Sequence, residues 1–203
     1  VGFIIDDMNL WGIGMISNLF DIKQIEVFNG PQSSIYGTNA MAGMINVISN
    51  NPKNKKEFTF NTSQYSYNGS TINTSISLPI TKKIFSRFTI SKNYTNSYIT
   101  NISGKNKKQD TNAKNEILFR NKTLFKPNKL LSIILTSYFV DLNNKYDVWS
   151  PDNNGYITYS DFQGFDKQKS KALSINSKLK LDNKTYTIIS SYSDNIMHYP
   201  YDG

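Results

Sequence analysis

The sequence contains no cysteine and a single histidine, His198. Disulfides and thiolate chemistry are therefore excluded, and a histidine-based metal site or catalytic triad lacks the residues it needs. The chain also has no apolar run of the roughly 18 residues that mark a transmembrane helix. We expect no metal or other cofactor and interpret His198 as a loop histidine at an outer rim.

Aromatic residues are abundant in this otherwise polar chain. There are 13 Tyr and 12 Phe, although the mean hydropathy is −0.47. Polar strands rich in aromatics suit a transmembrane β-barrel, because one strand face meets lipid and the other meets water. The net charge of +8 suits nucleic acid, anionic lipid or a small anionic ligand, although a composition rich in Lys and Asn gives the same charge without any such partner.

A change of composition near residue 52 predicts a domain boundary. Gly, Met and Ile are common before it, whereas Ser, Thr, Asn, Lys and Tyr dominate after it. The polar stretch 50–56 is a suitable linker. We expect one domain over residues 1–52 and a second over 53–203. No signal peptide is present and both ends are abrupt, so we interpret the chain as an internal piece of a longer protein.

Beyond residue 52, apolar and polar residues alternate with a period of two, which predicts β-strands. Within 72–78, for example, Ile, Thr, Ile and Leu alternate with Asn, Ser and Ser. The alternating stretches are about as long as a tilted barrel strand must be to cross a bilayer. We expect about seven strands, at 56–66, 69–79, 83–94, 113–126, 130–142, 171–182 and 185–196.

The predicted connections alternate between short and long. Residues 79–82, 127–129 and 182–184 are turn-like, whereas 95–112 and 143–170 are long and polar. A membrane barrel shows this asymmetry, with short turns at one end and long loops at the other. A soluble β-sandwich is the alternative, but its strands usually have about five or six residues, and loops this long are uncommon in compact domains.

Residues 20–52 combine strand and turn signals in a dense order. An apolar run surrounds Glu26, the turn signal Gly30-Pro31 follows, and a second apolar run surrounds Asn46. These signals predict a strand, a turn, a short helix or turn, and another strand. The residues that define the pattern are Glu26, Gly30, Pro31, Tyr36, Gly37, Gly43 and Asn46.

This stretch resembles the plug signature of TonB-dependent outer-membrane receptors, in which an IERIEV-RGP-S-LYG pattern and a later GG-INI lead into the barrel. Residues 1–10, VGFIIDDMNL, resemble the family's VGIYIDGVPL strand. The resemblance implies a mainly β fold: the C-terminal half of a plug domain, then the first seven or so antiparallel strands of a transmembrane β-barrel. The Gly-Pro-Gln-Ser variant at 30–33 resembles the receptors for siderophores and small cofactors.

The resemblance also implies a function, that of a transporter and not of an enzyme. A receptor of this family takes up a scarce ligand across the outer membrane of a Gram-negative bacterium, and we expect a ferric siderophore, with cobalamin or another small solute as the alternative. Its partners would be the TonB complex, reached through an N-terminal box that precedes this piece, and the lipid bilayer. We expect a monomer that binds no nucleic acid. A basic β-rich nucleic-acid module is the alternative from another class, and it needs Lys and aromatics on one face.

One departure from the family concerns the contact between plug and barrel. The family usually has Arg where Asn29 stands, and that Arg commonly pairs with acidic residues of the barrel wall. Asn29 carries no charge, so this ion pair is absent here. The adjacent acids Asp6 and Asp7 are a separate feature. Neighbouring strand residues point to opposite faces, so we interpret the pair as a strand end rather than as paired carboxylates.

Two groups of residues are candidates for ligand contact. Tyr146 and Trp149 lie in the predicted long loop, where aromatic residues form an interfacial girdle or stack on a ligand. Basic residues alternate with apolar ones on two predicted strands and would favour an anionic ligand if they face the interior. These basic residues are Arg120, Lys122, Lys178 and Lys180. The other tyrosines near predicted outer strand ends are Tyr65, Tyr67, Tyr94, Tyr98 and Tyr138.

A calcium loop is a further pattern that residues 150–161 only partly match. Ser150 stands at the first position, where calcium loops have Asp, and Asp161 stands at the last, where they have Glu. We therefore expect a turn-rich loop here and no metal site.

Overall fold

The computed structural model describes residues 2–10, 19–31, 42–103, 109–146 and 155–200, and every regular element in these ranges is a β-strand. No helix among the described residues is long and apolar enough to cross a membrane. The strands form a small N-terminal sheet and a large sheet that follows it in sequence, while a third sheet joins two loops.

The N-terminal sheet is mixed, with strand order β2-β1-β4-β3. β1 and β2 form a hairpin whose turn residues, Asp6 and Asp7, have φ of 47° and 68°, a conformation that short polar residues tolerate. The predicted strand end at this pair is confirmed. β4 pairs in parallel with β1 and antiparallel with β3. The bounds are β1 Gly2–Ile5, β2 Met8–Asn9, β3 Ile22–Asn29 and β4 Gly43–Ser49.

The large sheet has seven strands in the order β14-β13-β11-β10-β7-β6-β5, and all its neighbours are antiparallel. Each strand pairs with the next long strand along the chain, as in the wall of an up-and-down barrel. Its strands are β5 Glu57–Tyr65, β6 Gly69–Pro79, β7 Ile84–Thr95, β10 Lys114–Phe125, β11 Leu131–Lys145, β13 Phe165–Leu181 and β14 Lys184–His198.

The predicted strand bounds agree closely at the short-turn end and less well at the loop end. The ends beside short turns all lie within one residue of prediction, but β11, β13 and β14 continue further into the predicted loops. The β11–β13 ladder continues as far as the pair Lys145 and Phe165. His198 is consequently the last residue of β14 rather than a loop residue. Within the loops, a small sheet forms from β8 Thr100–Asn101, β9 Gln109–Asp110 and β12 Ile157–Thr158.

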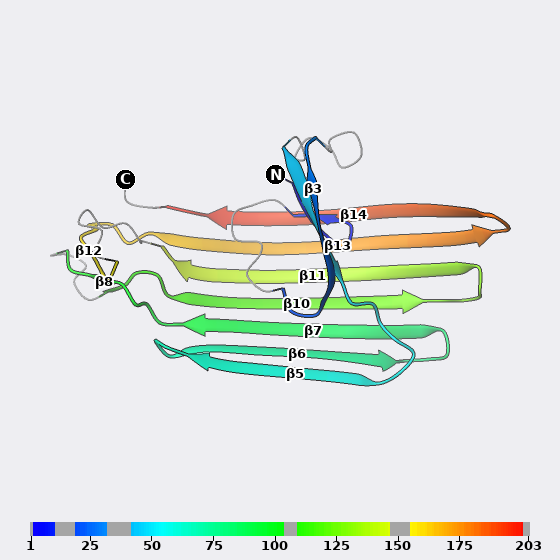
Figure 1. Cartoon of the computed structure of the whole chain (residues 1–203), viewed down its shortest axis with the longest axis horizontal. Coiled ribbons are helices and arrows are strands. Elements are labelled where there is room, and N and C mark those ends of the chain that lie inside the picture. The colour runs from blue at the N-terminus through cyan, green and yellow to red at the C-terminus, as the bar shows by residue number, and fades with distance from the viewer. Residues whose placement is uncertain (1, 11–18, 32–41, 104–108, 147–154, 201–203) are drawn as a thin grey trace.

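The N-terminal sheet lies across the large sheet and crosses its strands (Figure 1). A hydrophobic core fills this contact, where Phe3, Met8 and Val47 of the N-terminal sheet meet Tyr138 and other residues of the large sheet. Tyr138 is 5% exposed and lies in the middle of β11, so its predicted place near an outer strand end is wrong. The remaining core residues are Ile5, Leu10, Leu118, Val140, Leu142 and Ala172.

Away from this core, the large sheet is polar on its inner face, which the N-terminal sheet covers, and apolar on its outer face. Ser75 and Ser174 on the inner face are each 2% exposed, whereas Phe58, Ile188 and Tyr192 on the outer face are 67%, 72% and 71% exposed. A soluble sheet has the opposite polarity, because it buries its apolar face in a core. The observed polarity suits a barrel wall whose outer face meets lipid.

Candidate functional site

The first of two charged contacts between the sheets centres on Asp21, just before β3. Arg87 of β7 donates to both of its carboxylate oxygens, with Nε–Oδ2 and Nη2–Oδ1 distances of 2.7 and 2.6 Å. Thr89 Oγ1 and Asn50 Nδ2 add hydrogen bonds of 2.8 and 2.9 Å. Arg120 of β10 donates to the Asp21 carbonyl and lies 3.7 Å from its carboxylate. We call these five residues the Asp21 cluster.

The pKa of Asp21 reflects this environment. Burial alone would raise the pKa, but hydrogen bonds from Arg87, Asn50 and Thr89 outweigh burial and hold the pKa below its ordinary value. A carboxylate with a lowered pKa in the folded state contributes stability above its unfolded-state pKa and loses it as the pH falls through the lowered value. The Asp21 contact is therefore fully charged at neutral and mildly acidic pH.

The second charged contact joins the β1–β2 turn to β10. Lys122 Nζ lies 2.8 Å from Asp6 Oδ1 and 3.2 Å from the Ser49 carbonyl. The Ser49 amide and hydroxyl also donate to the Asp6 carboxylate, at 3.0 and 2.5 Å. The Asp6 and Lys122 side chains are only 3% and 5% exposed. We call these three residues the Asp6 cluster. Ser174 Oγ adds a hydrogen bond to the Asp6 carbonyl.

These contacts show where the four basic candidates lie. Arg120 and Lys122 are on the inner face, which is the condition under which they would favour an anionic ligand. Arg120 already pairs with Asp21, however, and Lys122 already pairs with Asp6. Lys178 and Lys180 are exposed in the half of β13 that ends at the short 182–183 turn. None of the four is therefore brought to the loop end of the sheet, and their role in recognising a ligand stays a prediction.

The plug-like motif is brought together only in part within the described ranges. Glu26 and Asn46 are cross-strand partners, and Asn46 Nδ2 donates to Glu26 Oε2 at 2.8 Å. Gly30 and Pro31 follow the end of β3, and Gly43 begins β4. Tyr36, Gly37 and Trp149 lie outside the described residues. Asn29 is exposed at the end of β3, so the charged contacts with the wall come from Asp6 and Asp21 instead.

Gly43 occupies a position that no other residue fits. Its φ is +139°, and an added Cβ would lie 2.7 Å from the Phe28 carbonyl oxygen. We expect Gly43→Ala to reduce the free energy of unfolding by about 2–3 kcal/mol, because both the backbone strain and the clash with a backbone atom must be relieved. Gly30→Ala is the matched control, since Gly30 has φ +84° with no atom within 4 Å of the added Cβ. It should cost about 1 kcal/mol. Thermal unfolding of the intact protein measures both variants. If Gly43→Ala and Gly30→Ala lose the same stability, the clash with the Phe28 carbonyl does not occur.

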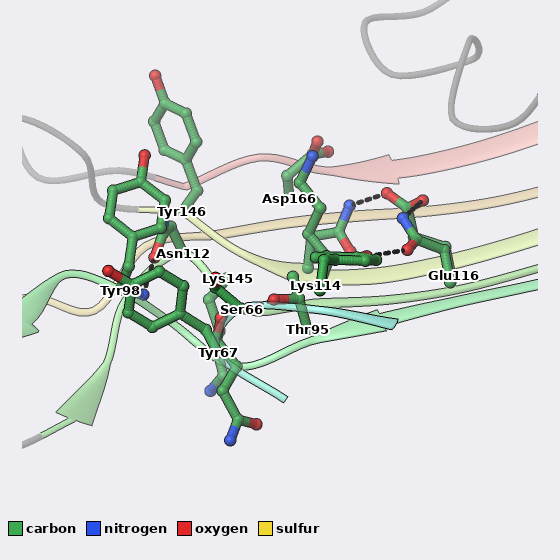
Figure 2. A pocket seen from close by; sticks show the side chains of 14 residues that line it. Ser66, Tyr67, Thr95, Tyr98, Asn112, Lys114, Glu116, Lys145, Tyr146 and Asp166 are labelled. Carbon is green, nitrogen blue, oxygen red and sulfur yellow. Dashed lines mark hydrogen bonds between the residues drawn. The ribbon is translucent and has the colours of Figure 1, made fainter. Parts of the chain in front are cut away.

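A cavity of about 790 Å³ lies at the loop end of the large sheet (Figure 2). Tyr67 and Tyr98 meet at a ring-centroid distance of 5.7 Å, and Tyr146 lies 4.8 Å from Tyr199. Tyr146 is one of the residues that line this cavity, and its contact with a ligand stays a prediction. The lining residues are Tyr65, Ser66, Tyr67, Asn93, Thr95, Asn96, Tyr98, Asn112, Lys114, Glu116, Asn144, Lys145, Tyr146 and Asp166.

The cavity also has a polar side, which the sequence alone did not reveal. Glu116 accepts hydrogen bonds from Asn93 Nδ2 at 3.0 Å and from Asn144 Nδ2 at 2.9 Å. Asp166 and Lys114 line the same cavity. These residues come from β7, β10, β11 and β13, so only the strand register places them together. The inward parity of Glu116 and Asn144 was the one usable signal in the sequence.

The fold is thus a piece of barrel wall whose polar inner face carries a small mixed sheet, and the same arrangement occurs in known receptors. No model of a known protein family matches the sequence. The chain is similar to the ferric yersiniabactin uptake receptor FyuA from Yersinia pestis, with a TM-score of 0.85 and 15% identity over 100% of this chain and 33% of that one. The ferric-catecholate import receptor Fiu from E. coli K12, in its open form, gives 0.77 and 16% over 97% and 32%.

A third similar structure is the ferripyoverdine receptor of the outer membrane of Pseudomonas aeruginosa, with a TM-score of 0.74 and 13% identity over 98% of this chain and 28% of that one. All three are receptors rather than enzymes. The chain spans about a third of the length of the receptors it matches. At these identities the likeness shows the fold, and it confirms the fold class predicted from the sequence.

Proposed function

We propose that the intact protein is a TonB-dependent receptor that takes up a ferric siderophore across the outer membrane of a Gram-negative bacterium. The observation that carries this proposal is the burial of Asp6 and Asp21 against basic residues on the inner face of the large sheet. Those ion pairs hold one sheet inside the wall formed by the other. A barrel large enough to contain such a sheet needs it as a plug against free passage. The shared fold with ferric-siderophore receptors supports the proposal.

In this proposal, residues 1–52 are the C-terminal half of the plug and 53–203 are the first part of the barrel. The last strand of the N-terminal sheet ends at Ser49 and the first strand of the large sheet begins at Glu57, which leaves the polar linker between them. The TonB complex would act through an N-terminal box that precedes this piece. The apolar outer face of the barrel would contact the lipid bilayer.

The loop-end cavity is the proposed ligand site of this part of the receptor. Its volume of about 790 Å³ falls in the range of sites for drug-sized ligands, and its tyrosines offer flat apolar surfaces. Lys114 and Lys145 line it beside Glu116 and Asp166, and the two lysine ammonium groups would contact the anionic part of a bound complex. They suit this role better than Lys178 and Lys180, which lie toward the short turns.

Tyr146→Ala should weaken binding of the transported ferric complex to the intact receptor by roughly tenfold, because the change removes a stacking surface worth about 1.4 kcal/mol. Tyr192→Ala is the matched control, since Tyr192 lies on the outer face and is 71% exposed. It should leave the affinity unchanged. Titration of the purified receptor, followed by quenching of its fluorescence, measures both variants. Equal affinity of the Tyr146 variant and the unaltered receptor would remove Tyr146 from the site.

The proposed function is tested by uptake. The intact gene is expressed in cells with and without TonB, and accumulation of labelled ferric siderophores is measured. TonB-dependent accumulation of an iron complex is the expected result. If the protein is present in the outer membrane but no iron complex enters, the siderophore assignment is wrong. Labelled cobalamin then tests the alternative ligand in the same cells.

A further inference from the structure

The net charge of this chain is distributed unequally between the two ends of the large sheet, because most of the acidic residues lie toward the loop end. Its short-turn edge consists of four segments: 53–57, 80–84, 126–130 and 180–184. Only two acids, Glu57 and Asp182, lie in these segments, so the edge accounts for nearly all of the chain's net charge of +8. The lysines of this edge are Lys53, Lys55, Lys56, Lys82, Lys83, Lys126, Lys129, Lys180 and Lys184.

These nine lysines form a continuous exposed border. Each is classed as exposed, and the strand order places the four segments side by side along one edge, at the right of Figure 1. Lys53 and Lys55 pair with Glu57. Among the described residues, Lys82, Lys83, Lys126 and Lys129 have no ion-pair partner. We call the nine residues the lysine border.

The turns hold the lysine border in place without using its charges. Thr81 Oγ1 accepts hydrogen bonds from the Lys83 and Ile84 amides at 3.1 and 3.0 Å. Asn128 Oδ1 likewise accepts from the Leu130 and Leu131 amides at 2.9 and 2.8 Å. The backbones of these two turns are thus fixed by short polar side chains, and the ammonium groups of Lys82, Lys83, Lys126 and Lys129 remain available for a partner.

Apolar residues beside the lysines indicate what that partner is. Ile80, Leu130 and Leu181 lie in or next to the same turns and are 56%, 50% and 43% exposed. The apolar outer face of the sheet therefore extends down to the border. A soluble acidic protein or free phosphate would not account for apolar residues there. The boundary between hydrocarbon and phosphate in a lipid leaflet matches both features, because lysine stems lie against apolar surface while their ammonium groups reach the headgroups.

We propose that the lysine border binds the phosphates of anionic glycerophospholipids in the leaflet that the short turns reach. The inference rests on the proposed outer-membrane location of the large sheet. Each lysine near an anionic membrane surface strengthens binding about fivefold, so removing two lysines weakens it by more than about tenfold.

The test uses the intact receptor, reconstituted in phosphatidylcholine bilayers with and without phosphatidylglycerol. Lipids retained by the released protein are counted by native mass spectrometry. We expect retention of phosphatidylglycerol over phosphatidylcholine. Apparent affinity should fall by at least about tenfold in the Lys82→Gln/Lys83→Gln and Lys126→Gln/Lys129→Gln variants. Added salt should weaken retention.

The control is the Lys169→Gln/Lys171→Gln variant, which removes two exposed lysines from the loop half of β13. It should retain phosphatidylglycerol as the unaltered protein does. An equal loss in control and border variants, or no preference for phosphatidylglycerol in a correctly inserted receptor, overturns the lysine-border proposal alone. Failure to insert into either bilayer overturns both this inference and the proposed outer-membrane function.

Discussion

Replacing Asp21 with Ala should release the N-terminal sheet from the wall at that point and cost about 3 kcal/mol of stability or more. The Asp21 side chain is 4% exposed, and the change leaves the Arg87 guanidinium, 7% exposed, without its main partner. Removing one member of a buried ion pair costs about 3–5 kcal/mol. We expect a loss near the lower end of this range, because Glu57 Oε2 remains 3.3 Å from Arg87 Nη1. Arg120 would also lose its nearby carboxylate.

This prediction is measured on the intact protein by thermal unfolding and, in cells that carry the variant, by the entry of a large antibiotic. Asp21→Ala should lower the unfolding temperature and admit the antibiotic. Asp7→Asn is the control, because Asp7 is exposed and its contact with Asn176 is a single exposed hydrogen bond. It should leave both measurements unchanged. If Asp21→Ala behaves like the control, the ion pair does not hold the two sheets together.

The two members of the Asp6–Lys122 pair should differ in their effect on stability. Asp6→Ala strands the buried Lys122 ammonium and should cost about 3–5 kcal/mol. Lys122→Met should cost less, about 1–2 kcal/mol, since the Asp6 carboxylate keeps the hydrogen bonds from the Ser49 amide and hydroxyl. Ser49, the third residue of the Asp6 cluster, is therefore the reason why Lys122→Met should cost less stability than Asp6→Ala.

A double-mutant cycle separates this pair from its surroundings. In the Asp6→Ala/Lys122→Met variant no charge is left unpaired, so it should be more stable than Asp6→Ala alone. Denaturant unfolding of the three variants and the unaltered receptor gives the coupling energy. If the double variant loses as much stability as the two single variants together, Asp6 and Lys122 do not interact in the folded protein.

The strands of the large sheet could be predicted because apolar and polar residues alternate along them, so that the two faces of the sheet differ. That rule fails where the inner face is also apolar. In β11, Tyr138, Val140 and Leu142 point inward and pack against the N-terminal sheet. The extension of β11 and β13 was missed for a different reason, because the polar residues at their loop ends pair as strands yet resemble loop sequence.

The sequence predicted that the two sheets are in contact, but it did not predict which residues make the contact. The resemblance indicated that a plug should be attached to the wall, and Asn29 showed that the family's arginine does not provide that attachment. Nothing local marks Asp6 or Asp21 as the replacement, because each meets a base that lies more than sixty residues away in the sequence. In both contacts the acid belongs to the N-terminal part of the chain and the base belongs to the large sheet.

The cavity residues were found only where a loop aromatic suggested them. Tyr146 was named because it lies in a long loop, whereas Glu116 and Asp166 lie inside strands that differ in neither composition nor pattern from their neighbours. Their meeting depends on how β10, β11 and β13 are aligned, which the sequence does not specify. The structure was therefore needed to show that Glu116 and Asp166 line the same cavity as Tyr146.

The most direct test of the account is whether the outer face of the large sheet meets lipid. The 203 residues contain no cysteine, so single cysteines can be placed along β14 once any others in the intact protein are replaced. Positions 188 and 190 share the outer face with Tyr192, whereas 189 and 191 share the inner face with Ser193, whose hydroxyl donates to the Asn9 carbonyl. A fluorescent label is attached to each cysteine, and quenching by spin-labelled lipid is measured in bilayers. We predict strong quenching at 188 and 190 and little at 189 and 191; equal quenching at all four positions would contradict the claim that this sheet is a membrane-spanning wall.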